Sequence, residues 1–215
     1  MSVADLPHRE VYWNVANPHL KVYVPAAIAI AIFIAGAVRR VRMWRQGRGT
    51  KRLDGLAERL ARGAAVAASQ SRVLGYVGPG ILHAALFFGF VVLFIGTLIV
   101  AVEADLGIRT ISRPSYFYWV YTVVLNLFGL VAIAGGVGLL ARRLFARPAH
   151  LENFRGDFLL LLLILAILAT GHLLQAARLA VARPWWAPYS FVSYPIALAL
   201  SGLGEQSLRS LHRAV

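Results

Sequence analysis

Four apolar stretches, each about 17 residues or longer, constrain this chain more than any other feature of its sequence. An α-helix rises ~1.5 Å per residue, so about 20 apolar residues cross the ~30 Å hydrocarbon core of a bilayer. We therefore predict an all-α membrane protein. Its four transmembrane helices are expected at residues 22–44, 79–102, 116–141 and 157–180.

The composition excludes most other classes of protein. Hydrophobic residues make up 59% of the chain and charged residues 14%, whereas a soluble domain has roughly 45–50% and about 25%. The net charge of +13 falls in blocks between the apolar stretches, which is typical of membrane loops, so we expect no nucleic-acid partner. The absence of cysteine excludes disulfides and thiolate-bound metal sites, and any iron–sulfur cluster must lie on a partner.

Lysine and arginine predict the orientation of the spans. The segment 39–77 contains ten of them and the loop 142–155 contains four, whereas the loop 103–115 contains only Arg109 and Arg113. The positive-inside rule places the two basic segments in the cytoplasm and both termini outside. Four arginines fall on the outer side against this rule: Arg178, Arg183, Arg209 and Arg213.

Two further segments are shorter or more polar than the spans. Residues 187–203 contain Pro188 and Pro195, and we predict a short interfacial or re-entrant segment there, with a fifth span as the alternative. The segment 39–77 is predicted to contain a basic amphipathic helix over Lys51–Ala68. This helix could lie on anionic lipid or dock a soluble partner.

Two histidines, His83 and His172, lie inside predicted spans. Intramembrane ionisable residues normally face the helix bundle and have a function, and axial ligation of haem iron suits a neutral imidazole. The alternative is a structural hydrogen bond to a neighbouring helix. His83 is ~6 Å and His172 ~22 Å from the inner end of its span. We therefore expect that the two cannot share one haem, and that each forms half of a site.

Carboxylates and small residues are the remaining candidates. Glu103 and Asp105 lie at the outer end of the second span, where protons released by a quinol could leave, although an interfacial solvated pair is the alternative. Asp157 fits a charge at a helix N-terminus. Glycines on the second and third spans suit a flat cofactor or close helix packing equally well: Gly89, Gly96, Gly129, Gly135, Gly136 and Gly138.

Several short motifs, in order along essentially the whole chain, resemble a known family. Residues 135–145, followed by Gly156-Asp157, resemble the γ subunit of respiratory nitrate reductase. A closer resemblance is to the nitrate-reductase-γ-like cytochrome b domain of membrane-bound iron–sulfur oxidoreductases related to heterodisulfide reductase. Its motifs match residues 10–14 (Glu-Val-Tyr-Trp-Asn), 39–42 (Arg-Arg-Val-Arg) and 94–98 (Phe-Ile-Gly-Thr-Leu).

The resemblance implies a b-type cytochrome that passes electrons between the quinone pool and a cytoplasmic iron–sulfur partner, in a multi-pass prokaryotic inner-membrane subunit. His83 matches the family ligand for the haem nearer the cytoplasm, whereas the region of the family's second ligand on that helix reads Val92-Leu93-Phe94 here. His172 matches no family ligand. The family has five helices, and the last carries two histidines. We expect that helix to come from downstream sequence or another chain. A haem-free membrane anchor for a soluble partner is the alternative function.

Overall fold

The computed structural model describes residues 6–46, 55–146 and 155–214, and these residues form helices, turns and connecting segments without a β-strand. Four helices are long and apolar enough to cross a membrane. They are α1 (Pro18–Arg45), α4 (Val77–Leu106), α5 (Tyr116–Ala141, continued by the π-helical turn Arg142–Ala146) and α6 (Arg155–Ala182). The predicted all-α membrane fold with four spans is confirmed.

The chain divides into two compact units, of which the smaller is Val15–Gln70. It contains α1 and α2 (Leu56–Ser69). Asn17 adopts a left-handed conformation with φ of 52° just before Pro18, and this turn starts α1 four residues earlier than predicted. Large apolar side chains along α1 are exposed, as expected of a helix whose surroundings are lipid. The predicted helix Lys51–Ala68 is found as α2, and residues 51–54 lie outside the described part.

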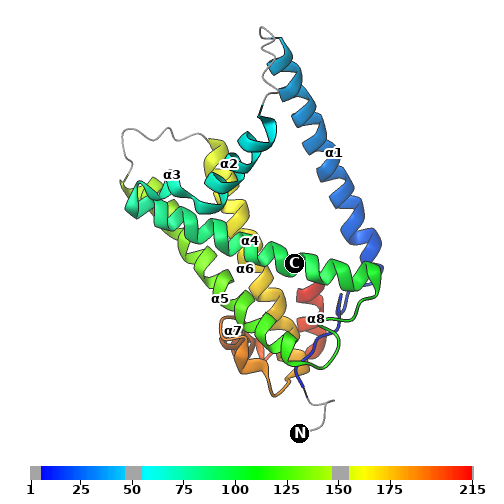
Figure 1. Ribbon diagram of the computed structural model, residues 1–215. Coiled ribbons are helices and arrows are strands. Elements are labelled where there is room, and N and C mark those ends of the chain that lie inside the picture. The colour runs from blue at the N-terminus through cyan, green and yellow to red at the C-terminus, as the bar shows by residue number, and fades with distance from the viewer. Residues whose placement is uncertain (1–5, 47–54, 147–154, 215) are drawn as a thin grey trace. The chain divides into compact units, whose positions relative to one another are not determined.

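The larger unit comprises Met1–Asn14 and Ser71–Val215. Within it, α4 packs along α5, and α5 packs on α6 (Figure 1). The contact between α4 and α5 is close because glycines face the opposite helix. A Cβ on Gly89 would lie 2.6 Å from Cβ of Ala132, and a Cβ on Gly135 would lie 2.6 Å from the carbonyl oxygen of Leu82. The glycines therefore serve helix packing, which is one of the two roles expected from the sequence.

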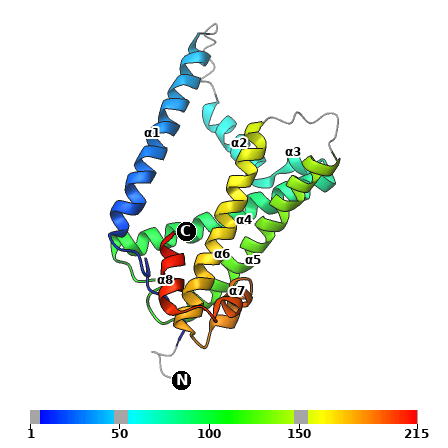
Figure 2. The same cartoon turned by 180° about the vertical axis from the view of Figure 1, so that it is seen from behind.

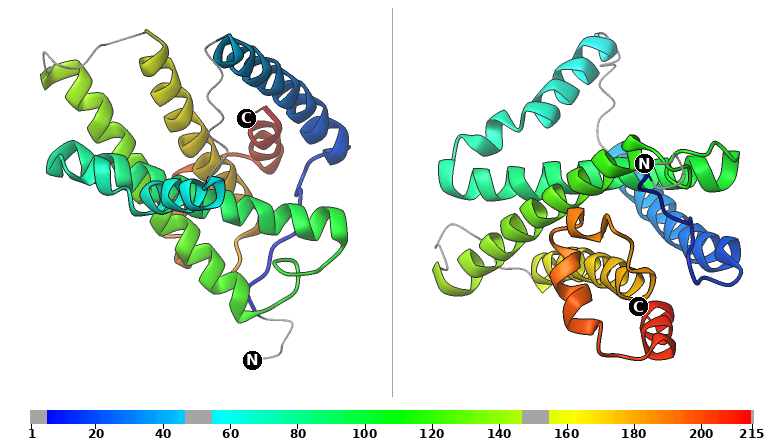
Figure 3. Two further views of the ribbon diagram at one scale, coloured as in Figure 1. Left: turned by 45° about the horizontal axis from the view of Figure 1, so that its top comes forward. Right: turned by 90° about the horizontal axis from the view of Figure 1, so that it is seen from below.

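The C-terminal part of the larger unit folds back on α6. After a 3₁₀ turn at Ala187–Tyr189 come α7 (Ser193–Leu200) and α8 (Glu205–Ala214), and both pack on α6 (Figures 2 and 3). Their common core consists of small and aliphatic side chains: Ala176, Leu179, Ala180, Ala187, Ala197 and Leu208. At eight residues, or ~12 Å, α7 is too short to span a bilayer, so the segment 187–203 forms no fifth span. The helix α8 was not predicted.

Candidate functional site

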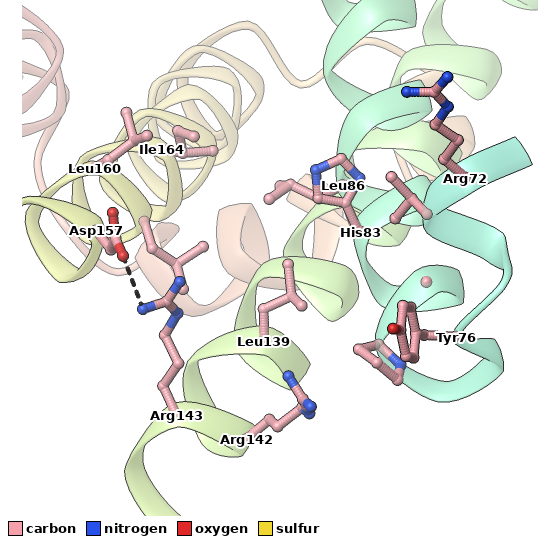
Figure 4. A pocket seen from close by; sticks show the side chains of 14 residues that line it. Arg72, Tyr76, His83, Leu86, Leu139, Arg142, Arg143, Asp157, Leu160 and Ile164 are labelled. Atoms are coloured by element: carbon pink, nitrogen blue, oxygen red, sulfur yellow. Dashed lines mark hydrogen bonds and ion pairs between the residues drawn. The ribbon is translucent and has the colours of Figure 1, made fainter. Parts of the chain in front are cut away.

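A cavity of about 670 Å³ lies at the end of the larger unit where α4 begins and α5 ends. Cofactor and small-molecule pockets typically measure ≈ 300–1,000 Å³. One part of its wall is aliphatic and comes from α4, α5 and α6: Leu86, Leu139, Leu160, Leu161 and Ile164. The other part carries polar groups, and Figure 4 shows two of them, His83 and Asp157, on opposite sides of the space.

The polar side of the cavity depends on a tight turn between α3 (Ser71–Leu74) and α4. The backbone N–H of Tyr76 donates to the carbonyl of Val73, and the N–H of Gly80 donates to the carbonyl of Tyr76 at 2.7 Å. A Cβ on Gly80 would collide with the backbone of Val73 and lie 2.9 Å from Cα of Leu74. Glycine at position 80 therefore allows α3 to lie against the first turn of α4, where Arg72 lines the cavity.

His83 lines this cavity one turn beyond Gly80. Its side chain is exposed, and no hydrogen bond among the described residues involves its imidazole. A neutral imidazole can bind a metal through a ring nitrogen. The arrangement leaves His83 available to a molecule that occupies the cavity.

The rim of the cavity is positively charged. Arg72, Arg142 and Arg143 line it together with one carboxylate, Asp157. Nη1 of Arg143 lies 3.2 Å from Oδ2 of Asp157, and the Arg143 guanidinium also lies over the Phe158 ring. Asp157 is in the first turn of α6, as predicted for a helix N-terminal charge. Since this carboxylate is paired, the cavity suits a ligand with an apolar body and anionic groups.

His172 lies elsewhere, in a buried polar network formed by α5, α6 and residues 190–193. Its exposed fraction is 9%, and its Nδ1 is 3.0 Å from Oγ of Ser193. Gln175 connects this pair to Ser190, and Asn126 connects Gln175 to the backbone. Buried polar groups in a membrane interior need such partners, because lipid supplies none.

The backbone N–H of Val192 and the backbone carbonyl of Thr122 determine which way the Asn126 amide points, and this in turn determines the proton positions in the network. Oδ1 of Asn126 accepts from the N–H of Val192, and its Nδ2 donates to the carbonyl of Thr122 and to Oε1 of Gln175. Oε1 of Gln175 also accepts the hydroxyl proton of Ser193 at 2.9 Å. Because that proton is already used, Oγ of Ser193 can only accept from His172. The neutral ring of His172 therefore carries its proton on Nδ1.

Glu103 is buried near the end of α4 and holds the following loop. Its carboxylate accepts the backbone N–H of Thr110, Ile111 and Ser112 and the hydroxyl of Thr110, at distances of 2.6 to 3.1 Å. Asp105 is exposed. The proton route predicted for this pair stays a prediction. Twenty residues of helix, or ~30 Å, separate Glu103 from His83. The predicted site residues are therefore not brought together: His83 lines the cavity, His172 lies in the buried network, and Glu103 holds the loop after α4.

Sequence reasoning missed the amide side chains of the network. Asn126 and Gln175 lie within two predicted spans, where uncharged polar residues commonly form hydrogen bonds between helices. Their position in apolar stretches was therefore a usable signal. Their partners at residues 190–193 could not be identified in the same way, because those contacts depend on how the segment after α6 folds back.

The sequence of this chain is similar to part of a known protein. Over 181 residues the chain is 32% identical to a protein of Syntrophomonas wolfei subsp. wolfei named EtfAB:quinone oxidoreductase. The match covers 82% of this chain but 24% of that protein, so the chain spans about a quarter of the length of its curated relative. No family model matches the chain. No solved structure matches it either.

Proposed function

We propose that the chain is the membrane electron-transfer domain of a quinone-linked oxidoreductase, in which His83 is an axial ligand of a haem b. The cavity beside His83 is the observation that carries this proposal. Similarity to part of a protein named EtfAB:quinone oxidoreductase supports the quinone-linked role. The resemblance of the sequence motifs to nitrate-reductase-γ-like cytochromes supports the haem.

The residues around the cavity would hold a haem and would supply one histidine to its iron. His83 is free to bind iron, the aliphatic wall suits a macrocycle, and Arg72 and Arg142 suit the carboxylates at its edge. When bound, the haem supplies one-electron transfer. No cluster of three or more metal-ligating side chains occurs in the described part of the chain, and the cavity lining contains one histidine. We propose that a histidine-bearing helix from downstream sequence or another chain completes the coordination.

The charge distribution supports placing the cavity and its partner on the cytoplasmic side of the membrane. The cavity lies at the end of the spans that the positive-inside rule assigns to the cytoplasm, beside the arginines of the π-helical turn. A cytoplasmic iron–sulfur partner could dock there through complementary charge. Quinone would then exchange electrons with the haem from within the bilayer of a prokaryotic inner membrane.

A difference spectrum, reduced minus oxidised, tests this proposal on the full-length protein in detergent. We expect a b-type signal in the unmodified protein and its loss in His83→Ala. The variant His172→Gln is the matched control, because His172 is the other histidine in a span. It also tests the possible ligand role of His172. Absence of a b-type signal from the full-length protein with all its chains would reject the haem assignment.

A haem-free membrane anchor is the second candidate function. The observation that favours it is the presence of a single histidine among the residues that line the cavity. An anchor would retain its complex with a soluble partner when His83 is replaced by alanine. Co-purification of the partner with His83→Ala, together with unchanged electron transfer to quinone, would support the anchor over the cytochrome.

A further inference from the structure

The N-terminal segment of the larger unit closes the end at which α5 begins and α6 ends. The N–H of Arg9 donates to the carbonyl of Ile111 at 2.9 Å, and the N–H of Ser115 donates to the carbonyl of Pro7. Farther along, Nδ2 of Asn14 donates to the carbonyl of Arg209 in α8. The segment 7–14 therefore contacts the loop after α4 on one side and α8 on the other.

At the same end of the larger unit is a group of residues that we call the cationic cluster: Arg9, Tyr118, Arg178 and His212. Arg178 is 8% exposed, and its Nη2 donates to the phenolic oxygen of Tyr118 at 3.2 Å. Burial lowers the pKa of His212, and the positive charges of Arg178 and Arg9 lower it further. Residues 7–9 bond to the loop that leads into α5, Arg178 bonds to Tyr118 of α5, and α8 packs on α6, so the three basic side chains belong to the same end of the larger unit.

The described residues supply no counter-charge to this cluster. Arg178 has a phenol as its hydrogen-bond partner, and neither Arg178 nor Arg9 forms an ion pair within the described ranges. The carboxylate of Glu103 is occupied by loop N–H groups, and that of Glu205 is paired with Arg209 at 2.7 Å. A buried guanidinium without an anion is costly, since the desolvation of the charge is not repaid.

Unpartnered polar atoms at the same end point to the same deficit. Four buried side-chain atoms without a hydrogen-bond partner belong to the segment or to residues that contact it or the cluster: Nε of Arg9, Oγ of Ser115, Nε1 of Trp186 and Nδ1 of His212. Trp186 contacts His8 with the two rings tilted, and His212 packs edge-on against Trp13. The site thus offers hydrogen-bond donors and positive charge, and it lacks an anionic acceptor.

We propose that the cationic cluster binds the phosphate oxyanion of an anionic phospholipid headgroup. Exposed aromatic side chains at this end of the unit mark the level of the membrane interface: Tyr116, Trp119, Trp185 and Tyr189. A headgroup phosphate at that level would accept from the guanidinium of Arg178 and from Nε of Arg9. This binding would explain why arginines occur on the side of the membrane where the positive-inside rule does not favour them.

Native mass spectrometry of the delipidated full-length protein tests the proposal with three probes: phosphatidylglycerol, phosphatidylcholine and inorganic phosphate. We expect one phosphatidylglycerol to bind preferentially. Its apparent affinity should fall about tenfold or more in Arg178→Gln, because a charge-assisted contact is lost. Arg9→Gln should weaken binding in the same direction. Binding of inorganic phosphate with the same sensitivity to both substitutions would assign the oxyanion to a soluble source.

Arg183→Gln is the matched control. Arg183 lies five residues beyond Arg178 and is exposed, and among the described residues its guanidinium donates to the carbonyls of Ala180 and Ser201. If Arg178→Gln does not fold, as judged by circular dichroism and size-exclusion chromatography, Arg9→Gln and Arg178→Lys give the readout. Equal binding of phosphatidylglycerol and phosphatidylcholine in all variants, or an equal loss in Arg183→Gln, would overturn the proposal.

Discussion

Nε2 of His172 lies against Gly129 of α5, so close that a Cβ on this glycine would be 2.6 Å from the ring nitrogen. The opposite edge of the ring bonds to Ser193. The imidazole is therefore held between α5 and the residues that follow α6. Both contacts require the same orientation of the ring, and each of them can be removed by a single substitution.

Gly129→Ala is expected to destabilise the larger unit. The added methyl group would displace the ring of His172 and break its bond to Ser193, and overpacking of this kind typically costs about 1–3 kcal/mol. The measurement is the unfolding temperature in detergent. Gly171→Ala is the control: a Cβ there meets nothing within 4 Å, and alanine favours a helix. Equal unfolding temperatures for the two variants would contradict the packing argument.

Ser193→Ala is expected to release the polar network. The change removes the acceptor for Nδ1 of His172 and the donor to Gln175, and each buried group left without a partner costs about 1–3 kcal/mol. We expect a lower unfolding temperature and faster hydrogen exchange in α7. Ser201→Ala serves for comparison, because the hydroxyl of Ser201 is exposed and donates to the nearby carbonyl of Leu198. If the network does not stabilise the protein, Ser193→Ala and Ser201→Ala will have the same unfolding temperature.

The spans could be predicted from the sequence because continuous apolar residues leave no alternative to a helix in lipid. The first residue of α1 was less predictable, since the left-handed residue Asn17 before it has no hydrophobic signal. The helix α8 was missed although Leu208, which is 2% exposed, anchors it to α6. Leu208 and Leu211 lie three residues apart on one face of this polar helix, which was a usable signal, but their spacing does not say which element that face packs against.

The candidate site was predictable in part for a similar reason. His83 could be named because a histidine in an apolar stretch stands out. The cavity depends on the close contact of α3 with Gly80, and nothing in the spacing of the residues indicates it. For His172, position in a span could not distinguish a ligand from a structural residue. The network around Asn126 shows a structural contact, and ligation by His172 stays a prediction.

Glu103→Gln is expected to loosen the loop between α4 and α5. The N–H groups of Ile111 and Ser112 bond to different carboxylate oxygens, and an amide keeps only one acceptor oxygen, so its NH₂ group would face at least one of them. Loss of hydrogen bonds to a charged acceptor typically costs about 2 kcal/mol. Hydrogen exchange at residues 110–112 should accelerate. In Asp105→Asn, which changes an exposed carboxylate, the same amides should exchange as in the unmodified protein.

The stability of the larger unit should fall in mild acid because of His212. Burial first, and then the charges of Arg178 and Arg9, lower the pKa of this imidazole in the folded protein. An unfolded histidine has a pKa of about 6.5. As the pH falls, the unfolded chain therefore takes up a proton before the folded one does. The stability that the neutral imidazole gives the folded protein is fully present above pH 6.5, and it is lost as the pH falls toward the lower folded pKa.

Unfolding temperatures of the unmodified protein and of His212→Asn between pH 7.5 and 5.5 measure this effect. The unmodified protein should lose more stability over this interval than the variant, and a variant with the same or a steeper decline would show that protonation of His212 does not govern the packing of α8.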